Sequence, residues 1–367
     1  MKKILKQVAI LVSIILIFIG CSSKNKESED KSSYKIGVVV GEGGVKDKSF
    51  NQANVEAVQS WAKENDATAH PPIESKSAAD INTNLQNVSS KSDIVSVAGY
   101  DFEKELPKIA EKNKDVKYIY IDMEAKGDNI VSAVFKEQEA GYLAGYVAAL
   151  QSKTGKVGFI GGLKIPPVAK FGLGFVQGAK EANPNIEVIY NYSGSFADIN
   201  KGKTIAATMY DEGADVIFTA AGNTGNGAIK EAQERAVNDL KDSGEIKHWV
   251  IGVDKDQYEE GTFKAKDKDG KDVEKSVILT SAMKKVDVAV KNILDKIKAG
   301  TFQGNTTLIF GIKENGLTLP NNNPNLSEDI ASKVKAIMEK ISSEEIKVKD
   351  DEKSLTESEK MIVKGEL

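Results

Sequence analysis

Two aspartates stand at matching places in the chain, each directly after a run of apolar residues. Asp122 ends the segment YIYID, and Asp254 ends the segment VIGVD. A pair of carboxylates could act as general acid and base, and carboxylates also accept hydrogen bonds from the hydroxyl groups of a ligand. Aspartate after a strand is equally common as a turn or capping residue. The residue type alone therefore leaves both a functional and a structural role open.

An aromatic residue, Phe50, follows the polar turn VKDKS and begins a helical pattern that continues through NQANVEAV. Helix starts are usually polar, so the ring either packs back onto the core or faces a cleft as a flat platform. Asp47 and Asn51 lie in the same turn and would line such a cleft. Phe196, in the segment GSF, presents the same two alternatives.

Several other chemistries lack their usual residues. The chain has two histidines, His70 and His248, and neither stands beside a candidate nucleophile or a second metal ligand. The segment GKT at 202–204 resembles the end of a phosphate-binding loop, but Ala197 stands where that motif requires glycine. We therefore expect no catalytic residues, no metal and no cofactor. Ligand binding is the simpler role for the paired aspartates.

The first 33 residues are typical of an export signal followed by a tether. Residues 1–20 join a lysine-rich start to a short apolar run, which predicts a signal peptide. Cys21, the single cysteine, is placed as the lipid-modified first residue of a bacterial lipoprotein; a plain membrane anchor and an unmodified thiol are the alternatives. Residues 21–33 are polar and predict a flexible tether. The expected location is the outer face of the cell membrane.

From Tyr34 onward, short β-branched runs alternate with helical patterns, which is typical of parallel βαβ units. The pattern occurs twice, with DIVSVAG from Asp93 matched by DVIFTAAG from Asp215. We predict an α/β protein with two doubly wound parallel-sheet lobes: residues 34–150 with a return segment at about 282–312, and residues 151–281 with a return segment at about 313–345. Residues 346–367 predict a charged C-terminal tail, as a surface helix or a loose segment.

Ligands of open parallel sheets bind beyond the carboxyl ends of the strands. Two such edges facing each other make a cleft, as in solute-binding proteins that close on a small molecule by hinge motion. Removing the three lysines of the signal takes the formal charge from −4 to −7. A mildly acidic protein with both signs interspersed gives no indication of a nucleic-acid surface.

Several stretches together resemble the basic membrane protein family, the PnrA-like nucleoside-binding lipoproteins of ABC transporters. The distinctive motifs are GGVKDKSFNQ at 43–52 and MYDEGADVIFTAAGNTGNG at 209–227, with IGVDKDQ at 251–257 and LTSAMKKVDVAV at 279–290 in the family's order. The resemblance runs from about residue 34 to 345. It implies a type I periplasmic-binding-protein fold, capture of a nucleoside such as inosine, guanosine or adenosine, and delivery to an ABC permease. We also expect a monomer.

The resemblance assigns roles residue by residue. Phe50 and Phe196 match the two rings that stack on a purine, and Asp122 matches a carboxylate in the base region. The group around the ribose is matched by Gly222, Asp254 and Lys284; judged alone, Lys284 would be a surface lysine.

The chain departs from the family pattern in the loop before Phe50. Many relatives carry an aspartate nine residues before the stacking phenylalanine, where it reaches the base. This chain has Gly41 there with Glu42 beside it, and Lys46 replaces a second acid. Glu42 is a candidate substitute for the missing aspartate, and an altered base preference is the alternative. Two further readings stay open: the same fold binding a sugar or another small signal molecule, and a hydrolase that cleaves nucleosides with Asp122 and Asp254.

Overall fold

The computed structural model describes residues 33–367, and residues 34–367 form one compact unit. The expected signal peptide, Cys21 and the expected tether up to residue 32 lie outside the described residues. Within residues 33–367, none of the helices combines the length and the apolar character that crossing a membrane requires.

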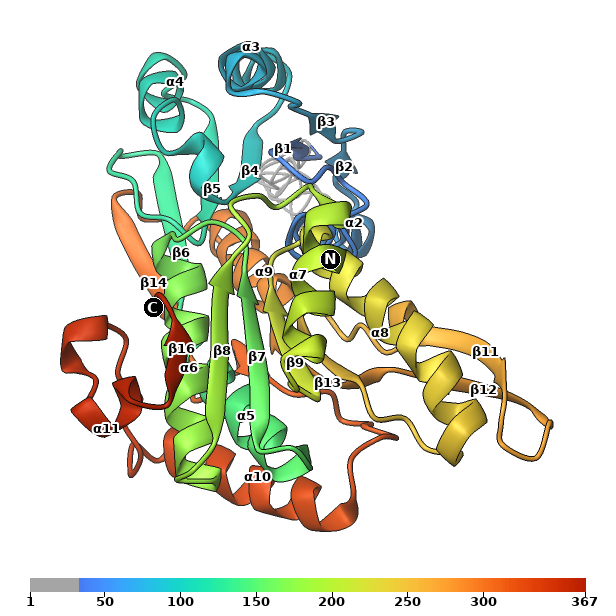
Figure 1. Cartoon of the computed structure of the whole chain (residues 1–367). Helices are drawn as coiled ribbons and strands as arrows, with labels where there is room; N and C mark the ends of the chain where they lie inside the picture. Colours follow the sequence, from blue (N-terminus) through green and yellow to red (C-terminus); the bar gives the residue numbers. More distant parts are fainter. Residues whose placement is uncertain (1–32) are drawn as a thin grey trace, which may run out of the picture. The chain divides into compact units, whose positions relative to one another are not determined.

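The first sheet is wholly parallel and follows the strand order β14-β6-β5-β4-β1-β2, with β3 also paired to β1. Its central strands are buried and rich in β-branched residues, as expected for a parallel sheet covered on both faces. The strands are β1 (Lys35–Val40), β2 (Thr68–Ala69), β3 (Ile73–Glu74), β4 (Ile94–Ala98), β5 (Lys117–Ile121), β6 (Ile130–Phe135) and β14 (Thr306–Phe310) (Figure 1).

The second sheet repeats this winding in the order β15-β13-β10-β9-β7-β8-β16, and only β15 runs antiparallel. In the first sheet β1 lies between β2 and β4, and in the second β7 lies between β8 and β9. This is the doubly wound order predicted from the sequence. The strands are β7 (Lys156–Gly161), β8 (Glu187–Tyr192), β9 (Val216–Ala220), β10 (Trp249–Asp254), β13 (Ile278–Lys284), β15 (Leu317–Thr318) and β16 (Val363–Gly365).

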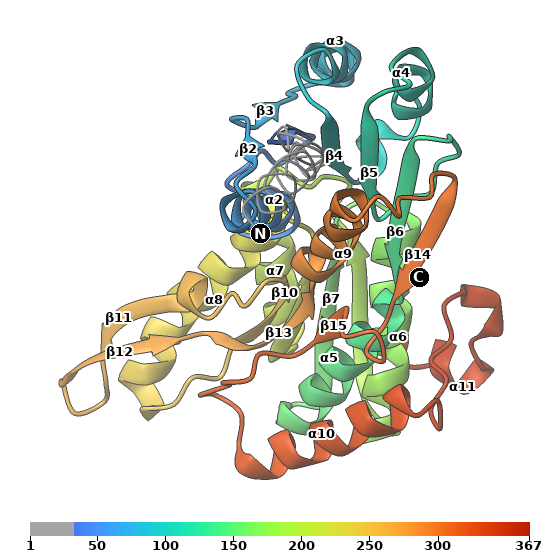
Figure 2. The same ribbon diagram turned by 180° about the vertical axis from the view of Figure 1, so that it is seen from behind.

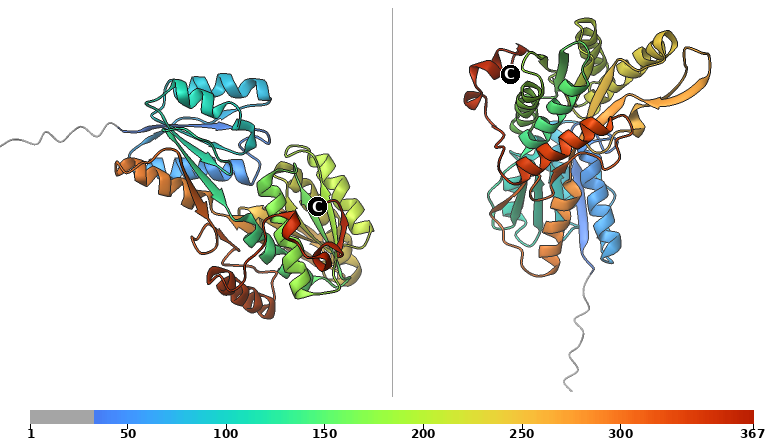
Figure 3. Two further views of the ribbon diagram at one scale, coloured as in Figure 1. Left: turned by 90° about the vertical axis from the view of Figure 1, so that its left-hand side faces the viewer. Right: turned by 90° about the horizontal axis from the view of Figure 1, so that it is seen from below.

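Helices cover both sheets. Around the first sheet lie α2 (Phe50–Glu64), α3 (Ala78–Ser89), α4 (Leu106–Lys112) and α9 (Val286–Lys298), with α2 and α9 packed side by side (Figure 3). Around the second lie α5 (Glu137–Gln151), α6 (Pro166–Ala182), α7 (Ile199–Asp211), α8 (Asn223–Ser243) and α10 (Glu328–Ser342), with α10 crossing under α5 (Figure 2). A hairpin of β11 (Thr262–Lys266) and β12 (Asp272–Ser276) lies against α8.

Helix α5 packs with the second sheet, although the sequence pattern assigned it to the first lobe, which we expected to extend to residue 150. Its main partner is α6, and glycines on both helices bring the two backbones together. A Cβ added to Gly141 would lie 2.1 Å from the carbonyl oxygen of Phe171, and one added to Gly145 would lie 2.0 Å from that of Phe175. Gly174 and Gly178 approach α5 in the same way. The first crossing between the sheets therefore comes just after β6.

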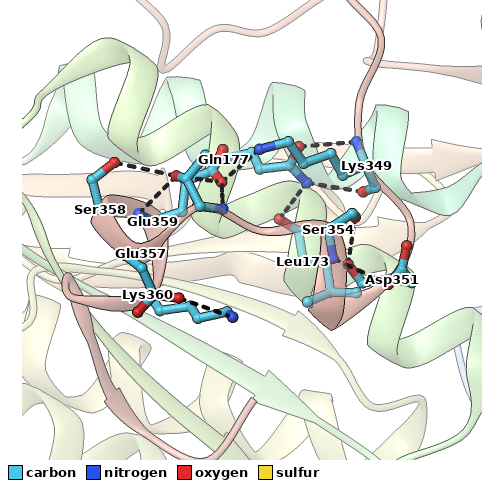
Figure 4. A network of polar contacts seen from close by, with 10 residues as sticks. Leu173, Gln177, Lys349, Asp351, Ser354, Glu357, Ser358, Glu359 and Lys360 are labelled. Atoms are coloured by element: carbon cyan, nitrogen blue, oxygen red, sulfur yellow. Dashed lines mark hydrogen bonds and ion pairs between the residues drawn. The ribbon is translucent and has the colours of Figure 1, made fainter.

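After β13 of the second sheet, the chain crosses to the first sheet, where it forms β14. It then returns to the second sheet and forms β15. The last residues correct the expectation of a loose or merely helical tail. Gln177 on α6 exchanges two hydrogen bonds of 2.9 Å with the backbone of Lys349, and the Lys349 ammonium lies 2.7 Å from Glu359 (Figure 4). After the short helices η3 (Glu352–Ser354) and α11 (Glu357–Lys360), β16 adds to the edge of β8. These contacts tie the charged tail to the second sheet.

Candidate functional site

A pocket lies where the carboxyl ends of the two sheets meet, the place at which open parallel sheets bind their ligands. It brings together every residue for which the sequence predicted a ligand-binding role: Asp47, Phe50, Asn51, Asp122, Phe196, Gly222, Asp254 and Lys284. The wall also includes residues that sequence reasoning did not select, among them Tyr100, Asp101, Met123, Ile165, Val168 and Phe171.

Phe50 is the first residue of α2, and its ring lies on the pocket wall with a minor part of its surface exposed. The start of the helix is fixed by Asp47, whose carboxylate accepts hydrogen bonds from the backbone N–H groups of Ser49, Asn51 and Gln52 at 2.8–3.1 Å. Burial raises the pKa of Asp47 to about 6, even though these three bonds favour its charged form. In this structure Asp47 serves the loop that presents Phe50.

Asn51 lines the pocket and also stabilises the loop before α2. Its side-chain amide donates to the carbonyl oxygens of Glu42 at 2.9 Å and Gly44 at 3.2 Å. The turn before α2 is therefore tied at both ends, and Phe50 is presented from a rigid support.

Phe196 comes from the second half, in the turn between β8 and α7. Its ring lies against Gly162, because a Cβ added there would be 2.2 Å from the ring. The ring centroid is 6.4 Å from that of Tyr100, which belongs to the first half. Gly222, at the start of α8 with φ +53°, lies beside the Phe196 backbone. Glycine is needed at such a backbone angle and close approach.

Lys284 is buried at the end of β13, with an exposed fraction of 3%. Its ammonium lies 2.5 Å from Asp122, 3.5 Å from Glu137 and 3.9 Å from Asp254. It also lies 4.8 Å from the centroid of the Phe50 ring, within the range of a cation–π contact. Burial disfavours the charge, but the three carboxylates outweigh it and raise the pKa of Lys284. This lysine is a buried cation and not the surface residue that its type alone would suggest.

Glu137 is the member of this cluster that the sequence analysis missed. It is 1% exposed at the start of α5, and burial raises its pKa to about 7 against the opposing charge of Lys284. Lys170 lies 3.8 Å away on its other side. A glutamate that follows a buried strand and begins an apolar helix is the only sequence signal for it.

Asp122 and Asp254 both adopt left-handed backbone angles, with φ +72° and +64°. Such angles cost of the order of 1–3 kcal/mol for a residue other than glycine and often mark functional sites. Asp254 accepts a hydrogen bond of 2.5 Å from the Ser49 hydroxyl of the other half, and burial raises its pKa. The Oδ1 atom of Asp122 is buried and makes no hydrogen bond to any described residue.

Direct hydrogen bonds join the two halves around the pocket. The Ser195 hydroxyl donates to Glu42 at 3.1 Å, and the amide of Gln257 donates to the carbonyl of Lys48 at 3.2 Å. The amide of Asn226 donates to the carbonyl of Asp47 at 3.1 Å. These contacts hold the loop before α2 against the second half. Among residues 33–367, no group of histidine, cysteine and acidic side chains is arranged to hold a metal ion.

The family model described as "ABC transporter substrate-binding protein PnrA-like" matches residues 34–352. The ABC transporter nucleoside-binding protein BmpA of Lactococcus lactis is 37% identical, over 87% of this chain and 91% of that protein. The CD4+ T-cell-stimulating antigen of Listeria innocua is 38% identical, over 91% and 94%, and basic membrane protein A of Borreliella burgdorferi is 32% identical, over 94% and 96%.

Solved structures agree with the fold. An ABC transporter solute-binding protein from Aeropyrum pernix superimposes with a TM-score of 0.73 at 26% identity, covering 87% of this chain and 95% of that one. A solute-binding protein from Conexibacter woesei gives 0.64 at 21% identity, with 87% and 99% covered. The type I periplasmic-binding-protein fold expected from the sequence is therefore confirmed.

Proposed function

The chain belongs to the PnrA-like family of ABC transporter substrate-binding proteins, and from that premise we propose that it captures nucleosides, purine nucleosides above all. The observation that carries the proposal is one pocket that combines two aromatic rings from opposite halves with a buried lysine and its carboxylates. The family and the fold are those of substrate-binding proteins rather than enzymes.

The base lies between Phe50 and Phe196 in this proposal. Both rings line the pocket and keep part of their surface exposed, so each has a face that a flat ring could cover. Stacking of a base on an aromatic side chain is worth about 1–3 kcal/mol in nucleic-acid-binding proteins. The neighbouring apolar wall of Ile165, Val168 and Phe171 suits a heterocycle better than a sugar.

In this proposal the ribose hydroxyls lie at the polar end of the pocket, beside Lys284 and its carboxylates. Asp254 offers a carboxylate acceptor, and the Lys284 ammonium offers donors. The resemblance assigns Asp122 to the base region, but it lies 2.5 Å from the same ammonium, so we place it with the ribose group instead. The unpartnered Oδ1 of Asp122 supports this assignment, because a buried carboxylate oxygen without a donor is costly until a ligand supplies one. Gly222 leaves space for the sugar beside the start of α8.

Delivery to a membrane permease completes the proposed role. Attachment through a lipid on Cys21 would keep the chain at the outer face of the cell membrane, with the polar residues that follow as a tether. Residues 34–150 with 282–312 and residues 151–281 with 313–345 remain our proposed lobes, except that α5 joins the second. The 346–367 segment packs with the second lobe as well.

Calorimetry on the full-length chain in mild detergent tests the proposal. Inosine, guanosine and adenosine are titrated in turn, with ribose and glucose as controls for a sugar site. We expect one-to-one binding of at least one purine nucleoside at micromolar or lower concentration, and no heat with either sugar. Absence of heat and of any thermal shift with all three nucleosides would contradict it. Chromatography of the inosine mixture for free hypoxanthine checks for hydrolysis, and we expect none.

A further inference from the structure

Gly41 and Asp101 lie against each other at one end of the pocket. Gly41 directly follows β1, and Asp101 lies in the short helix η1 (Tyr100–Phe102) directly after β4. A Cβ added to Gly41 would lie only 2.0 Å from the Oδ2 atom of Asp101 and 3.2 Å from its Cβ. The bare backbone at position 41 is therefore what allows the Asp101 carboxylate to occupy this place.

The Asp101 carboxylate is fixed in orientation while keeping acceptor capacity. Its Oδ2 atom accepts a hydrogen bond of 2.8 Å from the backbone N–H of Glu42. The Tyr100 hydroxyl is a second hydrogen-bonding partner. A carboxylate has about four lone-pair sites, so these two bonds leave room for donors from a ligand. The Asp101 side chain belongs to the pocket wall.

The neighbouring acid, Glu42, has a different partner. Its Oε1 atom accepts the hydrogen bond from Ser195 of the second half, and the residue is exposed. Glu42 therefore contributes to the contact that closes the pocket. Both acids line the pocket, but Asp101 is the less exposed of the two and is not engaged by the second half, which favours it as the carboxylate that a ligand meets.

Asp101 also lies at the edge of the space between the two proposed platforms. A Cβ on Gly99 would be 3.5 Å from the Phe50 ring, and the Tyr100 ring lies beside the Phe196 ring. Residues 99–101 thus pass from one ring to the other. The edge of a flat base held between the rings would face this segment.

We propose that Asp101 reads the edge of the base and makes the site selective for 6-oxopurine nucleosides over adenosine. This inference rests on the proposed function. Guanine presents two adjacent donors, N1–H and the 2-amino group, to which a carboxylate is complementary. Hypoxanthine presents N1–H alone. Adenine presents the lone pair of N1, which a carboxylate oxygen repels. The expected order of affinity is guanosine, then inosine, then adenosine.

The test is a set of calorimetric titrations of these nucleosides at pH 7, on the full-length chain and three variants. The wild-type chain should prefer guanosine to adenosine by about 10- to 100-fold, the range expected for hydrogen bonds to a charged group. Asp101→Asn should reduce guanosine affinity about tenfold or more and adenosine affinity much less, because an amide also offers a donor to adenine N1.

Gly41→Ala tests the same inference without altering the carboxylate itself. The added methyl group would displace Asp101, so selectivity should fall in the same direction, whereas the control Glu103→Gln, an exposed acid of the same segment outside the pocket wall, should leave the guanosine-to-adenosine ratio unchanged. Melting of each unliganded variant confirms that it is folded. Equal wild-type affinities for all three nucleosides, or an Asp101→Asn variant that weakens all three equally, would overturn the inference while leaving nucleoside capture intact. Failure of every nucleoside to bind the wild-type chain would overturn both.

Discussion

The ends of β5 and β10 are equivalent positions in the two halves, and they carry the same residue in the same conformation. Asp122 and Asp254 both have left-handed backbone angles, and both face Lys284. Their partners differ, because Asp122 is the nearest carboxylate to the lysine and Asp254 hydrogen-bonds to Ser49 of the opposite half. The same residue in the same backbone conformation therefore has two roles. Asp122 positions the buried Lys284, and Asp254 links the two halves.

The difference between the partners of Asp122 and Asp254 follows from the strand that lies next to each of them. The neighbouring strand β6 ends in Phe135, whereas its counterpart β13 ends in Lys284. The Lys284 ammonium lies 5.4 Å from the centroid of the Phe135 ring, so the two non-identical residues are themselves in contact. One cation at the boundary is shared by carboxylates of both halves. The sharing predicts that losing the cation costs more than losing either aspartate.

Replacing the cation should have the largest effect. Lys284→Met leaves three buried carboxylates without their counter-charge, and removal of one partner from a buried ion pair costs about 3–5 kcal/mol. Urea unfolding at pH 7 measures this loss. The adjacent Lys285→Met is the matched control and should change stability by less than about 0.5 kcal/mol. Equal unfolding midpoints for both variants would show that the cluster does not depend on Lys284.

Replacing the aspartates one at a time separates their roles. Asn tolerates the left-handed angle, so Asp122→Asn and Asp254→Asn change charge with little backbone strain. We expect Asp122→Asn to lower the free energy of unfolding by about 2–3 kcal/mol, and Asp254→Asn to lower it less. Nucleoside affinity should fall by about 10- to 100-fold in either variant, as expected for loss of a hydrogen bond to a charged group, so the two halves are distinguished by stability. Equal losses of stability in the two variants would remove the distinction between the two halves.

Loss of one platform should affect binding but not folding. Phe50→Ala is expected to weaken nucleoside binding about 10- to 100-fold, as stacking on one face disappears. Melting of the unliganded protein should fall only slightly, because the ring is partly exposed and packs at the edge of the core, where it contacts Lys284. Phe50→Tyr, which keeps the stacking face, is the control. A large drop in unliganded melting temperature would indicate that the ring is a packing residue.

Protonation of the shared cluster should give the smallest effect. Glu137 has a folded-state pKa of about 7, raised by burial above its ordinary value of 4.5, so the folded protein binds a proton more tightly than the unfolded chain between these values. Stability should therefore fall as pH rises from about 4.5 to 7. Relative to wild type, Glu137→Gln should flatten this slope by about 1–2 kcal/mol in urea titrations at pH 5 and pH 7.5. The exposed Glu124→Gln should keep the wild-type slope, and an unchanged slope in Glu137→Gln would argue against the assigned protonation.

The sequence predicted the parts of the fold that depend on local pattern. Alternating strands and helices, and the repeated aspartates at strand ends, were sufficient for two doubly wound sheets. Which sheet α5 packs with was not predictable from the sequence. It depends on the close contact between Gly141 and Gly145 of α5 and the backbone of α6. The attachment of the tail is similar, since Lys349 meets Gln177 only in the folded chain.

The site divides in the same way. Residues at strand ends or in recognisable motifs, such as Phe50 and Asp254, could be selected from the sequence because their place beyond a strand sets their direction. Glu137 could not, because it joins the cluster only through its contact with Lys284 of a distant segment. Asp101 also follows a strand, but its role depends on the approach to Gly41, which the folded chain alone brings together. The absent side chain at Gly41 was the available signal for Asp101, and it indicated a gap without indicating what fills it.

A crystal structure of the protein with guanosine tests the central claim most directly. The account predicts the base between the Phe50 and Phe196 rings, with ribose hydroxyls on Asp254 and Lys284. A structure with Phe50 turned into the first half and the nucleoside bound elsewhere would contradict it.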